Sequence, residues 1–140
     1  MGSAIIEHIN LSVSDPDRAA AMASALFGWT ERWRGAAADG GLSIHVGNER
    51  SYIAYHGTPG THRGGRFEKG APFNHVGVEV DELGAVEARV LAHGLVPFGH
   101  GDYEPGKRFY FFDPDGIEYE IVSYSAPASE QDAAVSLEVM

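Results

Sequence analysis

The chain has 140 residues, 44% of them hydrophobic, which suits one domain or two small pseudo-repeats that share a core. A net charge of −10 argues against nucleic acid and anionic membranes as partners. Without cysteines, disulfides and thiolate metal sites are excluded, and His, Asp and Glu remain as ligands. No apolar run could span a bilayer and no signal peptide is evident, so a cytoplasmic location is expected.

The first predicted element is a half-buried strand over residues 5–13, where apolar and polar residues alternate. Its polar face carries His8. Asp15 followed by Pro16 then predicts the start of a helix, with Asp as N-cap and Pro at the first helical position. Gly28 is the expected end of this helix.

A second strand and helix repeat this pattern in the other half of the chain. Segment 74–80 alternates as the first strand does, and it places His75 where the first strand has His8. Asp81 is expected to cap the helix that follows, and Gly94 is expected to end it. The shared pattern indicates an internal repeat.

Three short strand-like runs follow each predicted helix. They are residues 29–34, 42–46 and 51–55 in the first half, and 95–99, 108–112 and 117–124 in the second. We therefore expect one domain over residues 1–125, built from two βαβββ pseudo-repeats at about 5–56 and 73–124. Between them, Gly-rich segment 57–72 is a linker or, alternatively, a mobile lid, and 126–140 is a C-terminal tail.

The last predicted strand follows an Asp-Pro-Asp-Gly turn at 113–116 and carries Glu118 and Glu120 on its polar parity. His8, His75 and Glu120 are then all expected on the sheet faces opposite the helices. Such groups cost free energy when they are desolvated alone, so their presence on half-buried strands needs an explanation. Two imidazoles and one carboxylate that converge form the facial triad suited to Fe(II), which Mn(II), Ni(II), Co(II) and Zn(II) also accept.

A simpler interpretation of these residues stays open. Each histidine could be a hydrogen-bonded structural residue, and Glu118 and Glu120 could both be solvated. The repeat favours the metal site, because it places His8 and His75 at equivalent positions.

Three stretches, 8–13, 74–80 and 109–120, resemble the motifs of the vicinal oxygen chelate superfamily. This superfamily includes glyoxalase I, bleomycin-resistance proteins, fosfomycin-resistance transferases and extradiol dioxygenases. The resemblance covers about residues 5–124. It implies an α+β fold in which two βαβββ modules pair into a mixed-sheet cup with the helices outside. It also implies a homodimer that acts on a small-molecule substrate.

The resemblance also implies a ligand set for one divalent metal ion, with Fe(II) favoured. The first-strand and fifth-strand histidines of the family correspond to His8 and His75. The family carboxylate lies four residues past the Gly of the turn, which selects Glu120 over Glu118. The bleomycin-binding members lack this three-ligand pattern.

The reaction class depends on the residues around this triad. Glyoxalase I members add a fourth ligand, usually Glu, from the fourth strand. This chain has no Glu there, which argues against glyoxalase activity unless His56 supplies the fourth ligand. Fosfomycin transferases use a basic residue beyond the last strand, and segment 123–131 has none. Extradiol dioxygenases add a fourth-strand His as acid–base and a Tyr ten residues before the Glu, the places held by His56 and Tyr110.

We therefore expect a divalent-metal-dependent enzyme that acts on a substrate with vicinal oxygens, most like an extradiol-type dioxygenase, with His56 and Tyr110 as catalytic residues. The alternatives are a glyoxalase-like isomerase or lyase, a fosfomycin-resistance-like transferase, and a non-catalytic small-molecule binding or resistance protein. At the two catalytic positions, the alternatives are a packed aromatic at Tyr110 and a loop residue at His56.

Overall fold

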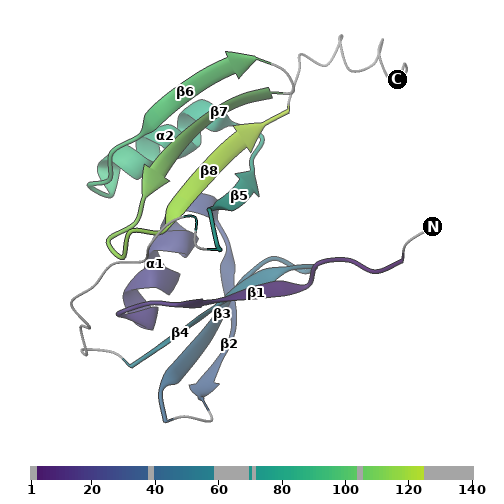
Figure 1. The fold of residues 1–140 in the computed structure, drawn as a ribbon, viewed down its shortest axis with the longest axis vertical. Helices are drawn as coiled ribbons and strands as arrows, with labels where there is room; N and C mark the ends of the chain where they lie inside the picture. Colours follow the sequence, from purple (N-terminus) through teal and green to yellow (C-terminus); the bar gives the residue numbers. More distant parts are fainter. Residues whose placement is uncertain (1–2, 38–39, 59–69, 71, 104–105, 125–140) are drawn as a thin grey trace. The chain divides into compact units, whose positions relative to one another are not determined.

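The computed structural model describes residues 3–37, 40–58, 70, 72–103 and 106–124. The chain divides into two compact units, Met1–Arg66 and Phe67–Met140, and each contains one helix and four strands (Figure 1). Most of segment 57–72, predicted as a linker or lid, and all of the tail 126–140 lie outside the described residues. No described helix is long and apolar enough to cross a membrane.

The first unit is a four-stranded mixed sheet with one helix packed on it. Its elements are β1 (His8–Ser12), α1 (Pro16–Phe27), β2 (Thr30–Ala36), β3 (Leu42–Gly47) and β4 (Tyr52–Gly57). The strand order is β1-β4-β3-β2, with β1 parallel to β4 and the other neighbours antiparallel. In this register His8 lies opposite Tyr52, and Ser12 lies opposite His56.

The second unit repeats this arrangement. Its elements are β5 (Val76–Glu79), α2 (Leu83–Ala92), β6 (Phe98–Tyr103), β7 (Gly106–Phe112) and β8 (Glu118–Ser123). The strand order is β5-β8-β7-β6. As in the first unit, the first strand of the module, β5, is parallel to the fourth, β8, and the other neighbours are antiparallel. The predicted α+β class and the two βαβββ modules with mixed sheets are therefore confirmed.

Helix α1 begins and ends as the sequence predicts. The Asp15 carboxylate accepts a hydrogen bond from the backbone N–H of Arg18 at 3.2 Å, and Pro16 is the first helical residue. Gly28 ends the helix with φ 73°, a left-handed conformation that favours glycine. Local side-chain chemistry was enough to fix both ends.

The predicted cap of helix α2 is wrong. The N-cap residue is Glu82, which makes no side-chain capping hydrogen bond, and the helix begins at Leu83. The backbone carbonyl of Asp81 accepts a hydrogen bond from the Ser123 hydroxyl at 3.4 Å, so this residue belongs to the junction with β8. Gly94 does follow the helix end, with φ 82°.

Strands β1 and β6 each start three residues later than the sequence predicts. β1 begins at His8, and Ile5 is 57% exposed, because the partner strand β4 itself begins at Tyr52, opposite His8. β6 begins at Phe98 and not at residue 95, because Phe98 is the first residue that pairs with β7, where its partner is Tyr110. In both cases the partner strand, and not the local pattern, sets the boundary.

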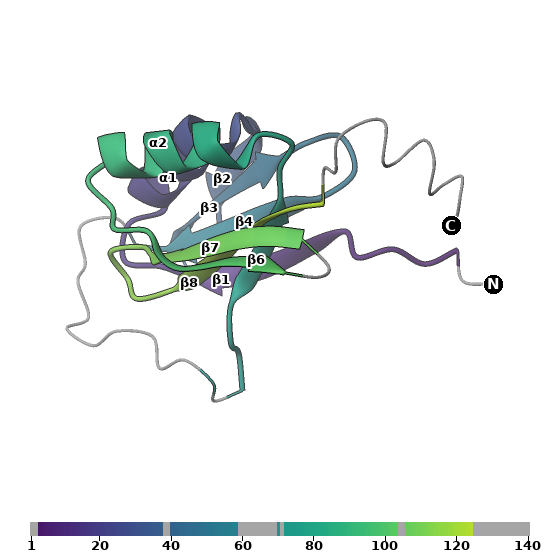
Figure 2. The ribbon, with the colours of Figure 1, turned by 90° about the horizontal axis from the view of Figure 1, so that it is seen from above.

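In each unit the helix packs on one face of its own sheet (Figure 2). The buried core residues of the strands share one face of each sheet, which we take as the face toward the helix. On this side lie Ile44, Val46, Ile53 and Tyr55 in the first unit, and Phe109, Phe111, Tyr119 and Ile121 in the second. We call the opposite side of each sheet its distal face. By strand parity the first distal face carries His8, Asn10, Ser12, Ser43, His45, Tyr52, Ala54 and His56. The second carries Arg108, Tyr110, Phe112, Glu118, Glu120 and Val122.

The turn that leads into β8 has the predicted form. The Asp113 carboxylate accepts hydrogen bonds from the backbone N–H groups of Asp115 at 2.8 Å and Ile117 at 2.9 Å. Gly116 adopts φ 86°. These contacts fix the start of β8 and therefore the face on which Glu120 lies.

Candidate functional site

The centre of the candidate site is a pair formed by His75 and Glu120 in the second unit. Glu120 lies on β8 opposite Gly77 of β5, and His75 lies just before β5. His75 Nε2 is 2.9 Å from Glu120 Oε1. Two ligand atoms bound to one octahedral first-row ion at about 2.1 Å and at a right angle lie about 3.0 Å apart. The pair therefore fits two neighbouring positions of such an ion.

Both nitrogens of the His75 ring face oxygen atoms. Nδ1 is 2.8 Å from Oδ1 of Asn74, on the other side of the ring from Glu120 Oε1. When Nδ1 carries its hydrogen toward Asn74, the lone pair of Nε2 faces the carboxylate. When the hydrogen is on Nε2 instead, the neutral ring donates it to Oε1, so the 2.9 Å distance suits either a hydrogen bond or two ligands of one metal ion.

The second oxygen of Glu120 is bound by two other side chains. Arg108 Nη1 donates to Oε2 at 2.6 Å, and the Tyr110 hydroxyl donates to the same oxygen at 3.2 Å. The side chains of Arg108 and Glu120 are only 12% and 13% exposed. Burial alone would raise the pKa of Glu120, but the hydrogen bonds from Arg108, Tyr110 and His75 outweigh it and lower the pKa below its ordinary value.

Arg108 is the residue of this cluster that the sequence interpretation missed. It lies on β7 two residues before Tyr110, so both side chains share the distal face. The sequence did hold a signal for this contact: Arg108 is a cation with the same strand parity as Tyr110, and its predicted strand neighbours the strand of Glu120. Glu118 is 4% exposed, and the side chain of Glu120 is 13% exposed. The interpretation of both as solvated carboxylates is therefore wrong.

Tyr110 is packed between other aromatic rings, and its hydroxyl also reaches the carboxylate. Its ring stacks on Phe98 at 5.8 Å between centroids and meets His75 edge-on at 6.1 Å. Gly99 lies beneath the ring with φ 68°, and a Cβ there would lie 2.8 Å from Tyr110 Cδ1. Tyr110 is therefore a packed aromatic as well as a polar contact of Glu120.

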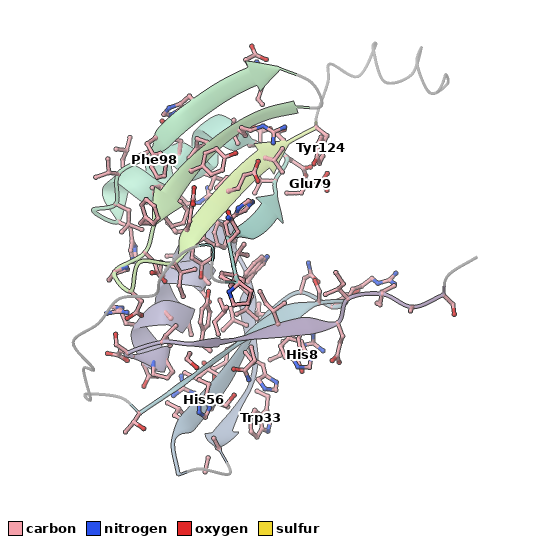
Figure 3. All side chains as sticks on the ribbon, viewed as in Figure 1. His8, Trp33, His56, Glu79, Phe98 and Tyr124 are labelled. Carbon is pink, nitrogen blue, oxygen red and sulfur yellow. The ribbon has the colours of Figure 1, made fainter. Side chains whose placement is uncertain are left out.

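His8 lies on the distal face of the first unit in a different environment. Its Nδ1 is 2.7 Å from Oε1 of exposed Glu7, and its ring stacks on Tyr52 at 4.9 Å with an interplanar angle of 10°. His45 stacks on the same tyrosine at 4.5 Å, and Trp33 contacts His45 at 4.9 Å. We call these four residues, one on each strand of the first sheet, the ring ladder; Figure 3 labels two of them, His8 and Trp33.

The ring ladder accounts for a histidine to which the sequence assigned no role. Burial of His45 lowers its pKa below the ordinary value, and the nearby positive charges of His8 and Arg32 lower it further. The Arg32 guanidinium lies 4.6 Å from the centroid of the Tyr52 ring, a cation–π distance. The first distal face is thus aromatic and rich in imidazole.

His56 is a strand residue, so the interpretation that it lies in a loop is wrong. It is on β4, between Ser12 of β1 and Ser43 of β3. On the distal face His8 lies opposite Tyr52, and His56 is four residues farther along β4. This separation along the strand is about 13 Å. This spacing counts against His8 and His56 as ligands of one ion.

The predicted site residues are thus divided between the units. His75, Glu120 and Tyr110 form one cluster in the second unit, whereas His8 and His56 belong to the first. Within neither unit do three His, Asp or Glu side chains of the described residues gather as a metal-binding group. The second unit therefore offers two of the three predicted ligands, and the first offers the remaining one.

Comparison with known protein families gives one match over most of the chain. The model of the Glyoxalase/Bleomycin resistance protein/Dioxygenase superfamily matches residues 5–121. No curated protein sequence matches the chain.

Solved structures also resemble the chain. A glyoxylase/bleomycin resistance protein/dioxygenase domain from Frankia sp. EAN1pec has a TM-score of 0.74 at 20% identity, over 87% of this chain and 98% of that one. The trypanothione-dependent glyoxalase I of Leishmania major has a TM-score of 0.71 at 14% identity, over 96% of each chain. TnmS3, an antibiotic binding protein from Streptomyces sp. CB03234, has a TM-score of 0.66 at 16% identity, over 89% of this chain and 99% of that one. At these identities the likeness is one of fold.

Proposed function

The chain belongs to the glyoxalase/bleomycin resistance protein/dioxygenase superfamily, and from that premise we propose a metal-dependent enzyme that acts on a small molecule with vicinal oxygens. Its reaction is most like that of an extradiol-type dioxygenase. The observation that carries the proposal is the 2.9 Å approach of His75 Nε2 to Glu120 Oε1, a spacing that suits two neighbouring ligands of one ion. His75, Glu120 and His8 would hold one divalent ion, with Fe(II) favoured by two imidazoles and one carboxylate.

The roles of the protein's own groups follow from their contacts. A bound divalent ion would withdraw electron density from two vicinal oxygens of the substrate and lower the pKa of a hydroxyl among them. Asn74 orients the His75 ring from the side away from Glu120. The Tyr110 hydroxyl donates to Glu120 Oε2 at 3.2 Å, and we propose that its oxygen accepts a hydrogen bond from a substrate hydroxyl. His56 is proposed as the acid–base that takes the second proton of the substrate.

The register of the first sheet favours this reaction over a glyoxalase-like isomerase. Glu120 lies opposite Tyr110 in the second sheet, and the equivalent pair in the first sheet is Ala54 and His45. The fourth-strand position that would supply a further carboxylate is therefore alanine. His56 lies two residues farther along β4, which supports a role for it off the metal.

A second candidate function is metal-free binding of a small molecule. The 2.6 Å ion pair between Arg108 and Glu120 favours it, because the guanidinium already neutralises the carboxylate. The aromatic ring ladder of the first sheet would suit a planar ligand. A protein of the same fold from Streptomyces is an antibiotic binding protein.

We also propose a homodimer, which light scattering at micromolar concentration would test.

Metal content tests the main proposal. Protein purified without chelators and reconstituted anaerobically with Fe(II) should hold about one equivalent of metal by elemental analysis, and His8→Ala, His75→Ala and Glu120→Ala should lose most of it. His100→Ala is the matched control, because His100 pairs with Glu87 away from the cluster. It should keep its metal. A wild type that takes up neither Fe(II), Mn(II) nor Zn(II) contradicts the proposal and favours the binding protein.

Turnover tests the reaction class. Oxygen uptake with catechols should be lost in His56→Ala while metal content is kept. Loss of metal in this variant would instead make His56 a ligand and favour the isomerase or lyase reaction. Full activity would remove His56 from the mechanism.

A further inference from the structure

The structure assigns Arg108 a role that rests on the proposed function. We infer that Arg108 is a positioning residue which holds Glu120 through one oxygen, and that its charge weakens the affinity of the His75–Glu120 pair for a divalent ion. The guanidinium is thus a built-in cation with which the metal competes.

Hydrogen bonds from its terminal nitrogens hold the guanidinium in place. Nη1 donates to Glu120 Oε2 at 2.6 Å, which is short for an N–H···O bond and typical of a charge-assisted one. Nη2 donates to the backbone carbonyl of Gly106 at 3.3 Å, on the same strand as Arg108. With 12% of the side chain exposed, the ion pair is little screened by water. Arg108 is therefore held in place by the strand as well as by the carboxylate.

The contacts of Arg108 decide how Glu120 can bind a cation. Oε2 already accepts from Arg108 and Tyr110, whereas Oε1 faces His75 Nε2 at 2.9 Å. A metal ion beside His75 can use Oε1 without breaking either bond to Oε2. The expected ligand is then a carboxylate bound through one oxygen and oriented by its second oxygen.

The charges decide how tightly the ion is held. With the imidazole neutral, Glu120 alone would give the cluster one negative charge, and Arg108 cancels it. A divalent ion thus enters a cluster with no net charge and meets a guanidinium hydrogen-bonded to its own ligand. Repulsion between cations a few ångströms apart is strong in a partly buried site. The affinity is therefore lower than the same ligands would give without Arg108.

The test is the Zn²⁺ affinity of the full chain, measured by competition with a chromophoric chelator. Arg108→Gln removes the charge and should tighten Zn²⁺ binding at least about tenfold. Arg108→Met removes the charge while keeping an unbranched stem, and should do the same. Arg108→Lys keeps the charge and should stay within about threefold of the wild type. A purely structural role predicts the opposite sign, because a disordered Glu120 would bind metal more weakly.

Lys107→Gln is the matched control. Lys107 precedes Arg108 on β7, is exposed, and lies on the opposite face. Removing its charge should change the Zn²⁺ affinity by less than about twofold, since exposed charges are screened. Urea unfolding of each variant identifies any that does not fold, and the remaining charge-removing variant then decides.

Each outcome separates the inference from the proposed function. Equal or weaker Zn²⁺ binding by the charge-removing variants, with binding by the wild type, overturns the inference and leaves the proposed function. Binding by these variants but not by the wild type supports the inference and removes the metal-dependent function. If neither binds Zn²⁺, both are overturned.

Discussion

The two distal faces come from the same βαβββ module, yet they carry different chemistry. Both modules place a histidine, His8 or His75, at the level of the first strand, and both pair that strand with the fourth in parallel. In the first unit this histidine stacks on a tyrosine ring and pairs with an exposed carboxylate, whereas in the second it contacts an amide and a carboxylate that is 13% exposed. The repeated backbone thus sets where side chains point but not what they do.

Three pairs of equivalent positions account for the difference. Where the second face has Glu120, Tyr110 and Arg108, the first has Ala54, His45 and Ser43. The first face therefore offers imidazole and aromatic surface, and the second offers a hydrogen-bonded carboxylate. Substitutions at these positions test whether the chemistry depends on the side chains or on the sheet.

The largest effect is expected from Glu120→Ala. Arg108 would keep a guanidinium that is 12% exposed without its counter-charge, so the free energy of unfolding should fall by about 3 kcal/mol. Urea unfolding measures this loss. Glu120→Ala combined with Arg108→Met should recover part of it, because the uncompensated cation is gone. A loss below about 1 kcal/mol for the single variant would show that the pair is worth no more than a surface ion pair.

A smaller effect is expected when the carboxylate is placed on the other face by Ala54→Glu. Ala54 is 2% exposed and lies between Asn10 and His45, with no arginine at the position equivalent to Arg108. We expect the free energy of unfolding to fall by about 2 kcal/mol at neutral pH, because the larger side chain overpacks the site and its charge is buried.

Ala54→Gln is the control for size in this experiment, and it should cost less than the glutamate at neutral pH. If the two substitutions destabilise equally, only volume matters at this position. The contrast between the two faces would then have no electrostatic basis.

The smallest effect concerns the protonation of His45 in the ring ladder. Its pKa is lowered in the folded protein, mainly by burial, from an ordinary value of 6.5. The unfolded chain therefore binds the proton more readily, and the stability contributed by neutral His45 is complete above about pH 6.5. It is lost as the pH falls from there toward the folded pKa.

The measurement is the free energy of unfolding of the wild type and of His45→Gln between pH 8 and pH 5. The wild type should lose more stability than the variant over this range. A difference between them that stays constant with pH would show that burial in the ladder does not affect the imidazole.

Much of the fold could be predicted from sequence because it depends on local chemistry. Asp15 and Gly28 fix the ends of α1 through their own side-chain and backbone preferences. Alternation placed Glu120 on the face opposite α2, with Tyr119 and Ile121 buried on the other. What could not be predicted is where pairing stops, as at Ile5, because that depends on a distant strand.

The candidate site shows the same limit. His75 and Glu120 could be selected by their spacing from recognisable motifs, and the structure brings them to 2.9 Å. Arg108 belongs to no such motif, and its strand parity indicates only its face; its contact with Glu120 depends on the pairing of β7 with β8. The same holds for the stacking of His45 on Tyr52, which requires the register of β3 and β4.

The parallel pairing of the first and last strands of each unit has a consequence for the order of folding. His8 meets Tyr52, and Val76 meets Tyr119, so each sheet is closed by contacts between residues far apart in sequence. Such contacts form slowly, because the intervening chain must be ordered first. The antiparallel β7–β8 hairpin, which joins Arg108, Tyr110 and Glu120, is local and can form before β5 docks. The carboxylate should therefore meet its arginine before it meets its histidine.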